Sequence, residues 1–322
     1  MIILNFFVFF LFSFILIKSA DLVAISLKGI SRRTKTGVFA LSAIIIAIGT
    51  SLPEMFVGLS AALEGSPNLS LGNIIGANIA NLSLVAGVSG LFIKSVYVRG
   101  SLLKRDVTVA LVASIAPLIL ILDLSLSRVD GLVLLAVYGV YITSLFKTQY
   151  SEIAKGVRPD YFHKLLRNIP VLDGHQTKEY GRLFLGLALL LWSSNILVRT
   201  SQGIATFFNV PLFLIGLIII SIGTTLPEFA FSIKSLKEHE PSMFFGNLLG
   251  SIIANSTLVI GLVAVISPIK IIALEDYFIA VLSFIIIFLI FWLFIKSKHR
   301  LDRWEALALI VLYALFVFVE FQ

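Results

Sequence analysis

The chain has 322 residues, of which 58% are hydrophobic and only 13% are charged. Its mean hydropathy is +1.03. Because soluble domains are about 25% charged, this composition excludes a cytosolic enzyme, a nucleic-acid-binding protein and a disordered protein. The absence of cysteine excludes disulfides and thiolate metal sites. The four histidines all fall in polar connections, so we expect no histidine metal site.

A membrane-spanning helix needs about 20 mostly apolar residues. The first apolar segment lacks the positive charge that precedes the apolar core of a signal peptide, so we expect it to remain as a helix. The sequence predicts an all-α polytopic membrane protein with ten transmembrane helices, at residues 2–27, 37–63, 69–93, 106–123, 129–146, 181–203, 211–236, 243–267, 275–295 and 304–321.

Lysine and arginine are distributed unevenly among the connections. With the N-terminus outside, the inner connections carry 21 of the 25 basic residues. The others are Lys18, within the first segment, and Arg128, Arg199 and Lys270 in outer connections. The positive-inside rule then places both chain ends outside the cell membrane and the polar linker 148–180 inside.

The two halves of the chain share a motif. Gly49-Thr50-Ser51-Leu52-Pro53-Glu54 recurs, at an offset of 174 in the numbering, as Gly223-Thr224-Thr225-Leu226-Pro227-Glu228. The same offset aligns, without a gap, Gly72-Asn73 with Gly246-Asn247, Gly76 with Gly250, Asn81 with Asn255 and Gly87 with Gly261. We therefore predict a duplication, with residues 1–147 and 181–322 as two five-helix repeats joined by the linker.

An odd number of helices in each repeat has a topological consequence. The second repeat begins on the opposite side of the membrane from the first, so the two repeats are inverted. Inverted repeats are typical of secondary transporters, whose sites lie near the midplane on interrupted helices.

The repeated motif has the residue types of a cation site. Pro53 and Pro227 leave backbone carbonyls without a donor, and carboxylates within a membrane, here Glu54 and Glu228, are costly and usually functional. Helical spacing aligns hydroxyls, amides and further carbonyls with them: Ala47, Thr50, Ser51, Asn81, Ser221, Thr224, Thr225, Ser251 and Asn255. These are the hard oxygen ligands that Ca²⁺ prefers, and Na⁺ can use them too.

Charge repulsion suggests how such a site exchanges ions. Two carboxylates about 5 Å apart at an effective dielectric constant near 20 repel by ~3 kcal/mol. The empty site would therefore resist full ionisation. It should hold one divalent cation, several monovalent cations or protons. This mutual exclusion leaves the monovalent counter-ion open.

Structural alternatives exist for several of these residues. A buried Glu can pair with Lys or Arg, although no basic residue lies between Lys35 and Lys94 or between Arg199 and Lys234. Asn81 and Asn255 can serve as interhelical hydrogen-bond glue, and for Asn73 and Asn247 packing or helix opening is as plausible as ligation. For Lys18 and Asp21 we favour a local pair or snorkelling.

At these residues the sequence resembles the sodium/calcium exchanger branch of the calcium/cation antiporter superfamily, in its small prokaryotic form. The resemblance covers two alpha repeats, 37–93 and 211–267. It implies that Glu54, Glu228 and the carbonyls of Thr50 and Thr224 bind Ca²⁺. It also implies Na⁺ sites made by Ser51, Thr225, Ser251 and the carbonyls of Ala47 and Ser221, with Asn81 and Asn255 lining the centre. Alternating access would come from sliding of the first and sixth segments against a core of eight helices, without a cofactor. A monomer would suffice, because both halves of the site are in one chain.

Three residues depart from the family pattern. Family members commonly have Ser at the position of Ala77 and at that of Thr225, and often Asp at that of Asn255. Loss of the hydroxyl at Ala77 makes Ca²⁺/H⁺ exchange an alternative to Na⁺/Ca²⁺ exchange. An intramembrane enzyme acting on lipid phosphate would need basic residues beside the acids, and a passive channel would need no counter-ion.

Overall fold

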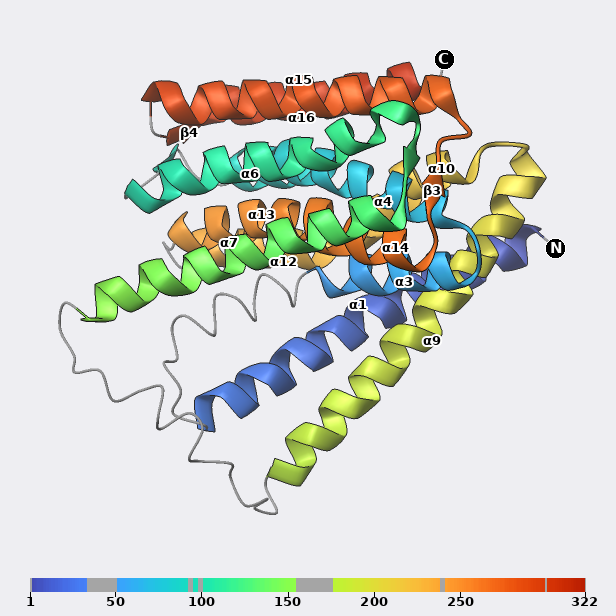
Figure 1. Ribbon diagram of the computed structural model, residues 1–322, viewed down its shortest axis with the longest axis horizontal. Coiled ribbons are helices and arrows are strands. Elements are labelled where there is room, and N and C mark those ends of the chain that lie inside the picture. The colour runs from blue at the N-terminus through green and yellow to red at the C-terminus, as the bar shows by residue number, and fades with distance from the viewer. Residues whose placement is uncertain are drawn as a thin grey trace.

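The computed structural model describes residues 2–33, 51–91, 95–97, 101–154, 176–237, 241–298 and 300–321. It is almost wholly helical (Figure 1). The first half contains α1 (Ile2–Arg33), α3 (Leu52–Leu63), α4 (Pro67–Ala80), the π-helical segment η1 (Asn81–Val85), α5 (Ala86–Leu91), β1 (Ser95–Tyr97), α6 (Ser101–Leu120), the 3₁₀ turn η2 (Ile121–Asp123), β2 (Ser125–Leu126) and α7 (Arg128–Ala154).

The second half contains a corresponding set of elements. They are α9 (Gln176–Phe208), α10 (Leu212–Leu214), the π-helical segment η3 (Ile215–Ile220), α11 (Ser221–Thr224), α12 (Leu226–Lys237), α13 (Pro241–Ile253), the π-helical segment η4 (Ala254–Val259), α14 (Ile260–Ile266), β3 (Ile269–Lys270), α15 (Leu274–Lys298), β4 (Arg300–Asp302) and α16 (Arg303–Glu320).

Element boundaries repeat along the chain with the offset of the sequence motif. That offset relates the first residue of α9 to the first residue of α1, and it relates both ends of α12 to the ends of α3. It also relates Pro241, the first residue of α13, to Pro67, the first residue of α4. A proline is well placed in a first helical turn because its missing N–H needs no partner there. The same local signals thus start corresponding helices in both halves.

Two short antiparallel ribbons join the halves. β1 pairs with β4, with Val96 opposite Leu301, and β2 pairs with β3, with Leu126 opposite Ile269. Each ribbon takes one strand from each half, and the offset of 174 relates the ribbons to each other approximately. β1 and β4 both lie in connections predicted to be inner, and β2 and β3 both lie in connections predicted to be outer.

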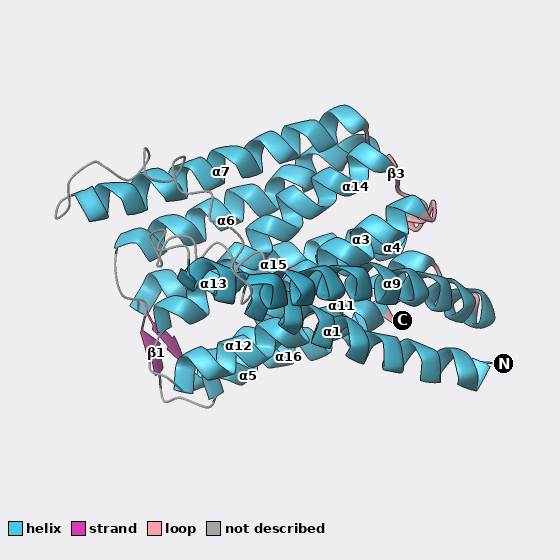
Figure 2. Ribbon diagram, turned by 90° about the horizontal axis from the view of Figure 1, so that it is seen from below, coloured by secondary structure: helices cyan, strands magenta, loops and turns pink. Residues whose placement is uncertain are grey.

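The two longest helices, α1 and α9, pack against each other along one side of the molecule (Figure 1). They share a hydrophobic cluster with α3 that includes Phe9, Val57 and Leu197 and is separate from the larger core. On α1, Lys18 Nζ lies 3.8 Å from Asp21, as a local pair requires. The larger core fills the space among α4, α6 and α13 to α16. Figure 2 shows the same arrangement from below, with α7 beside α14 and α16 beside α5.

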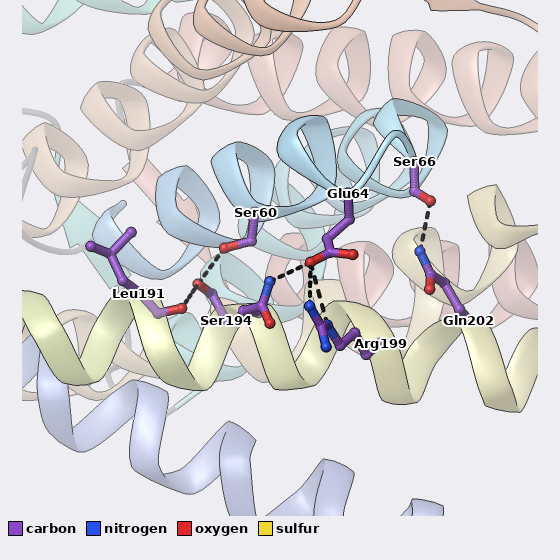
Figure 3. A network of polar contacts seen from close by, with 8 residues as sticks. Ser60, Glu64, Ser66, Leu191, Ser194, Arg199 and Gln202 are labelled. Atoms are coloured by element: carbon purple, nitrogen blue, oxygen red, sulfur yellow. Dashed lines mark hydrogen bonds and ion pairs between the residues drawn. The ribbon is translucent and has the colours of Figure 1, made fainter.

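Polar contacts also tie the end of α3 to α9 (Figure 3). Glu64 accepts hydrogen bonds from Asn195 Nδ2 at 2.7 Å and from Arg199 at 2.9 Å. Ser60 and Ser194 hydroxyls lie 2.7 Å apart, and Gln202 donates to Ser66 at 2.8 Å. This row of contacts is confined to one end of α3 and its following turn.

Close backbone packing brings α4 against α10 and η3. A Cβ atom added at Gly72 would meet the Phe213 carbonyl, and one at Gly76 would meet that of Leu217. From the other side, a Cβ at Gly216 would meet the carbonyl of Leu69. Glycine is therefore required at these positions for the two halves to approach as closely as they do.

Long apolar helices and exposed apolar side chains identify a multi-pass membrane protein. Within the described residues, six helices are long and apolar enough to span a bilayer, and Leu52–Leu63 and Val107–Asp123 are shorter apolar helices. α7 and α16 fall at the two remaining predicted segments. Large apolar residues face outward on α1, α15 and α16, where lipid rather than water would cover them.

Several helices differ in length from the predicted segments. α1 extends to Arg33, and α7 and α9 extend into the predicted linker as far as Ala154 and from Gln176. Hydropathy locates the apolar part of a helix, whereas backbone hydrogen bonding continues into polar residues beyond it. Residues 34–50 lie outside the described part of the chain, and with them Ala47 and Thr50.

Candidate cation site

The first carboxyl group of the site comes from the start of α3. Ser51 precedes the helix, and Pro53 and Glu54 lie in its first turn. The Glu54 side chain is fully buried, and neither carboxylate oxygen has a hydrogen-bond partner among the described residues. The Ser51 hydroxyl is likewise buried without such a partner. A buried carboxylate without partners is very costly, so this group calls for a cation or a proton.

The second carboxyl group occupies the corresponding place in the other half. The helix is interrupted at Thr225, between α11 and α12, because Pro227 cannot donate to the carbonyl of Gly223. Glu228 follows in the first turn of α12 and is fully buried. Ser251 Oγ donates to its Oε1 at 3.4 Å, and its Oε2 has no described partner. The predicted helix interruption is thus present in the second half.

The two carboxyl groups lie close enough to repel each other when both are ionised. Their mutual repulsion adds to the cost of burial, and a cation between them would offset both. The described helices α4, α5, α11, α13 and α14 contain no charged residue that could neutralise the pair. The arrangement therefore favours a bound cation over an internal ion pair.

Two asparagines occupy equivalent π-helical segments. Asn81 begins η1, and Asn255 is the second residue of η4. Single-turn π segments in α-helices are frequent at functional sites, because they shift side chains and loosen the backbone hydrogen bonding. Both asparagines are fully buried, and neither amide atom of Asn81 has a partner among the described residues. Interhelical hydrogen bonding to the helices that the structure describes does not account for Asn81.

Some hydroxyl and carbonyl groups of the second half form hydrogen bonds with one another. The Ser221 carbonyl accepts from Thr225 Oγ1 at 2.9 Å and from Thr224 Oγ1 at 3.3 Å. Thr224 Oγ1 also donates to Asn73 Oδ1 at 3.1 Å, which links the halves, and Thr224 neighbours Glu54 as well. The Ser221 carbonyl is thus positioned by two threonine hydroxyls of the repeated motif.

All the described residues of the expected site are buried. They lie in or next to α3, η1, α11, α12, α13 and η4, namely Ser51, Glu54, Asn81, Ser221, Thr224, Thr225, Glu228, Ser251 and Asn255. Contacts within this set join Ser251 to Glu228, Thr224 and Thr225 to Ser221, and Thr224 to Glu54. Ala47 and Thr50 lie outside the described residues. Ala77 is also fully buried and brings no oxygen from its side chain.

The sequence analysis missed Asn78. Its amide bonds to both Asn255 and Ser256, across the boundary between the halves. The offset of 174 places Ile252 opposite it, so an analysis based on the repeat passes over it. Its position three residues before Asn81, on the same face of one helix, was the available signal.

This fold defines a class: a helical, multi-pass membrane protein with a buried carboxyl group at the equivalent place in each half. Residues 4–147 and 178–322 match the family described as sodium/calcium exchanger protein. The chain belongs to this family, which confirms the resemblance found in the sequence.

Individual relatives agree. The chain is 25% identical over 353 residues to the sodium/calcium exchanger MaX1 of Methanosarcina acetivorans, with 100% of this chain and 99% of the relative covered. It is 29% identical over 283 residues to the inner membrane protein YrbG of Escherichia coli, with 86% of each covered. A solved structure of the sodium-calcium exchanger NCX_Mj, soaked with Na⁺ and Sr²⁺, matches with a TM-score of 0.64, 26% identity and 98% of each chain covered.

Proposed function

We propose that this chain is a secondary antiporter that exchanges Ca²⁺ for Na⁺ across the cell membrane by alternating access. The observation that carries the proposal is the pair of fully buried carboxyl groups, Glu54 and Glu228, at equivalent positions of the two halves. Between them they leave three carboxylate oxygens without a hydrogen-bond partner among the described residues. Neutral oxygen donors surround them, as a hard cation requires.

Charge balance makes the site an exchanger. One Ca²⁺ neutralises both carboxylates, and two Na⁺ ions do the same. Each arrangement excludes the other, because a third positive charge would be buried without a partner. Ca²⁺ would lie between Glu54 and Glu228, with the carbonyls of Thr50 and Thr224. Na⁺ would use Ser51, Thr225, Ser251 and the carbonyls of Ala47 and Ser221, with Asn81 and Asn255 lining the centre.

The proposed architecture is ten spanning helices in two inverted repeats, 1–147 and 181–322, joined by the inner linker 148–180. The two ribbons support it, because each pairs strands from connections that this topology puts on one side of the membrane. The N- and C-termini then lie outside. The extensive packing of α1 against α9 supports movement of these two helices as one unit against the others. One chain contains the whole site, so a monomer suffices, with no cofactor and no catalysed reaction.

Exchange of Ca²⁺ for protons is the second candidate. The observation that favours it is Ala77, which is buried in the position where a hydroxyl would serve a Na⁺ ion. Protons need no such ligand and can neutralise Glu54 and Glu228 directly. The two candidates differ only in the counter-ion and are separated by one measurement.

The test is uptake of radioactive Ca²⁺ into proteoliposomes loaded with Na⁺, with choline, or with choline under a pH gradient that is acid inside. We expect uptake only with internal Na⁺. Uptake driven only by the pH gradient would establish proton exchange instead, and uptake in every condition would indicate a channel.

Two substitutions test the site itself. Glu54→Gln and Glu228→Gln each remove a charge and should each abolish Na⁺-driven Ca²⁺ uptake. Asp21→Asn is the matched control, because its side chain is half exposed on α1 and pairs with Lys18. Unchanged uptake in both glutamine variants would refute the proposed site.

A further inference from the structure

Three buried polar side chains form a directed chain of hydrogen bonds beside the cation site. Asn255 Nδ2 donates to Asn78 Oδ1 at 3.3 Å, and Asn78 Nδ2 donates to Ser256 Oγ at 2.8 Å. Asn78 comes from α4 of the first half, whereas Asn255 and Ser256 come from η4 of the second. Each of the three side chains is at most 3% exposed.

This chain of bonds determines which end of the Asn255 amide remains available. A carboxamide has an acceptor oxygen on one side and a donor nitrogen on the other. Because the nitrogen bonds to Asn78, the oxygen is the free end, and Asn255 Oδ1 is buried with no hydrogen-bond partner among the described residues. A turned amide would instead present N–H groups, which repel a cation.

We propose that Asn78 and Ser256 are positioning residues that hold the Asn255 amide with its oxygen toward the transported cation. This inference rests on the proposed function and adds a specificity element to the same site. Neither residue need touch the ion. Asn78 provides the acceptor that fixes Asn255, and Ser256 provides the acceptor that keeps Asn78 from turning.

A small cavity completes the chain at its far end. It measures about 10 Å³ and is lined in part by Asn78, Ser114 and Ser256. That volume is close to the least that holds a single water molecule. A water there would accept a hydrogen bond from the Ser256 hydroxyl, while the Ser256 oxygen accepts the hydrogen bond from Asn78.

The duplication shows that this device is not a general packing feature of the fold. The offset of 174 places Ile252 opposite Asn78 and Leu82 opposite Ser256. Asn81, the counterpart of Asn255, accordingly has no amide partner among the described residues. Within the described part of the chain, therefore, hydrogen bonds orient Asn255 but not Asn81.

The contrasting interpretation is that Asn78 and Ser256 merely hold the two halves together. A double-mutant cycle separates the two, because a positioning residue acts only through the group that it positions. The variants are Ser256→Ala and Asn78→Leu, each made in the wild type and in an Asn255→Ala background. Ser256→Thr keeps the hydroxyl and is the matched control.

In the wild-type background we expect Ser256→Ala and Asn78→Leu each to raise the KM for Ca²⁺ about fivefold, the change expected for one hydrogen bond. The maximal rate should change much less. Ser256→Thr, which keeps the hydroxyl, should have the wild-type KM. In the Asn255→Ala background neither substitution should raise the KM further. An equal rise in both backgrounds would overturn the inference.

The unfolding midpoint of each variant, measured with and without Ca²⁺ or Na⁺, gives a second measurement. The shift that a cation produces reports binding without transport. If wild-type vesicles exchange no Ca²⁺, the proposed function fails, and the same cycle is then evaluated on these shifts. The inference is supported if Ser256→Ala and Asn78→Leu reduce the cation-induced shift in the wild-type background but not in the Asn255→Ala background. An equal reduction in both backgrounds refutes it.

Discussion

Replacing Gly76 by Ala tests whether close contact between α4 and η3 holds the two halves together. The added Cβ would overlap the Leu217 carbonyl and lie 2.7 Å from Ser221 Oγ. The carbonyl belongs to the backbone and cannot rotate away as a side chain would. The helices must therefore separate, and Ser221 moves with η3.

The size of the effect follows from two opposing contributions. Alanine is favoured over glycine in a helix by about 1 kcal/mol, whereas overpacking a tight interface costs about 1–3 kcal/mol and occasionally more. Gly139 supplies the control, because it lies within α7 and a Cβ there would meet nothing within 4 Å. The difference in unfolding free energy between Gly76→Ala and Gly139→Ala isolates the steric contribution, which we expect to be about 3 kcal/mol.

Thermal unfolding of the purified protein in detergent measures this difference, and Ca²⁺ uptake measures its consequence. We expect Gly139→Ala to match or exceed the wild type in stability and to transport normally. Gly76→Ala should unfold at a lower temperature and have a higher KM for Ca²⁺. Equal stability of the two alanine variants would refute the close approach of α4 and η3.

Two further predictions concern polar groups. Asn81→Leu removes a buried amide that has no partner among the described residues. It should therefore raise the unfolding free energy by about 1–3 kcal/mol and also raise the KM for Ca²⁺. A fall in both stability and KM would contradict this. Hydrogen bonds from Asn195 and Arg199 lower the pKa of Glu64 below its ordinary value of 4.5. A carboxyl group with a lowered pKa stabilises the fold at pH values above its ordinary pKa. This contribution to stability is lost as the pH falls through the lowered pKa. The loss of stability in Glu64→Gln, measured by thermal unfolding, should therefore be constant from pH 6 to 9 and should shrink only in acid.

The duplication made much of the fold predictable. Starts of corresponding helices depend on local signals that both halves retain, such as Pro67 and Pro241, so the offset found in the sequence also relates the observed helix boundaries. The buried carboxyl groups were predictable for a similar reason. A charged residue following proline in an apolar segment has few structural explanations.

Contacts that break the symmetry were not predictable. Asn78 and Arg199 both bond across the boundary between the halves, and neither has a polar counterpart at the offset of 174, where Ile252 and Ile25 stand. A partner that is distant in sequence leaves no local periodicity. The π-helical segments were missed because an extra residue in one turn depends on tertiary packing rather than on the sequence of that turn.

The departures from symmetry also give the two carboxylates different surroundings. Ser251 donates to Glu228 across a spacing of 23 in the sequence, and Ala77 stands at the same spacing from Glu54. Among the described residues Glu54 therefore lacks the hydrogen bond that its counterpart has, and under the proposed function its charge depends more strongly on a bound cation. Ala77→Ser should supply that hydrogen bond together with an additional oxygen ligand. We expect this variant to lower the half-saturating Na⁺ concentration for Ca²⁺ release, measured as Na⁺-driven efflux from loaded vesicles, with Ala80→Ser as the control. An unchanged Na⁺ dependence in Ala77→Ser would mean that the buried alanine does not limit Na⁺ binding.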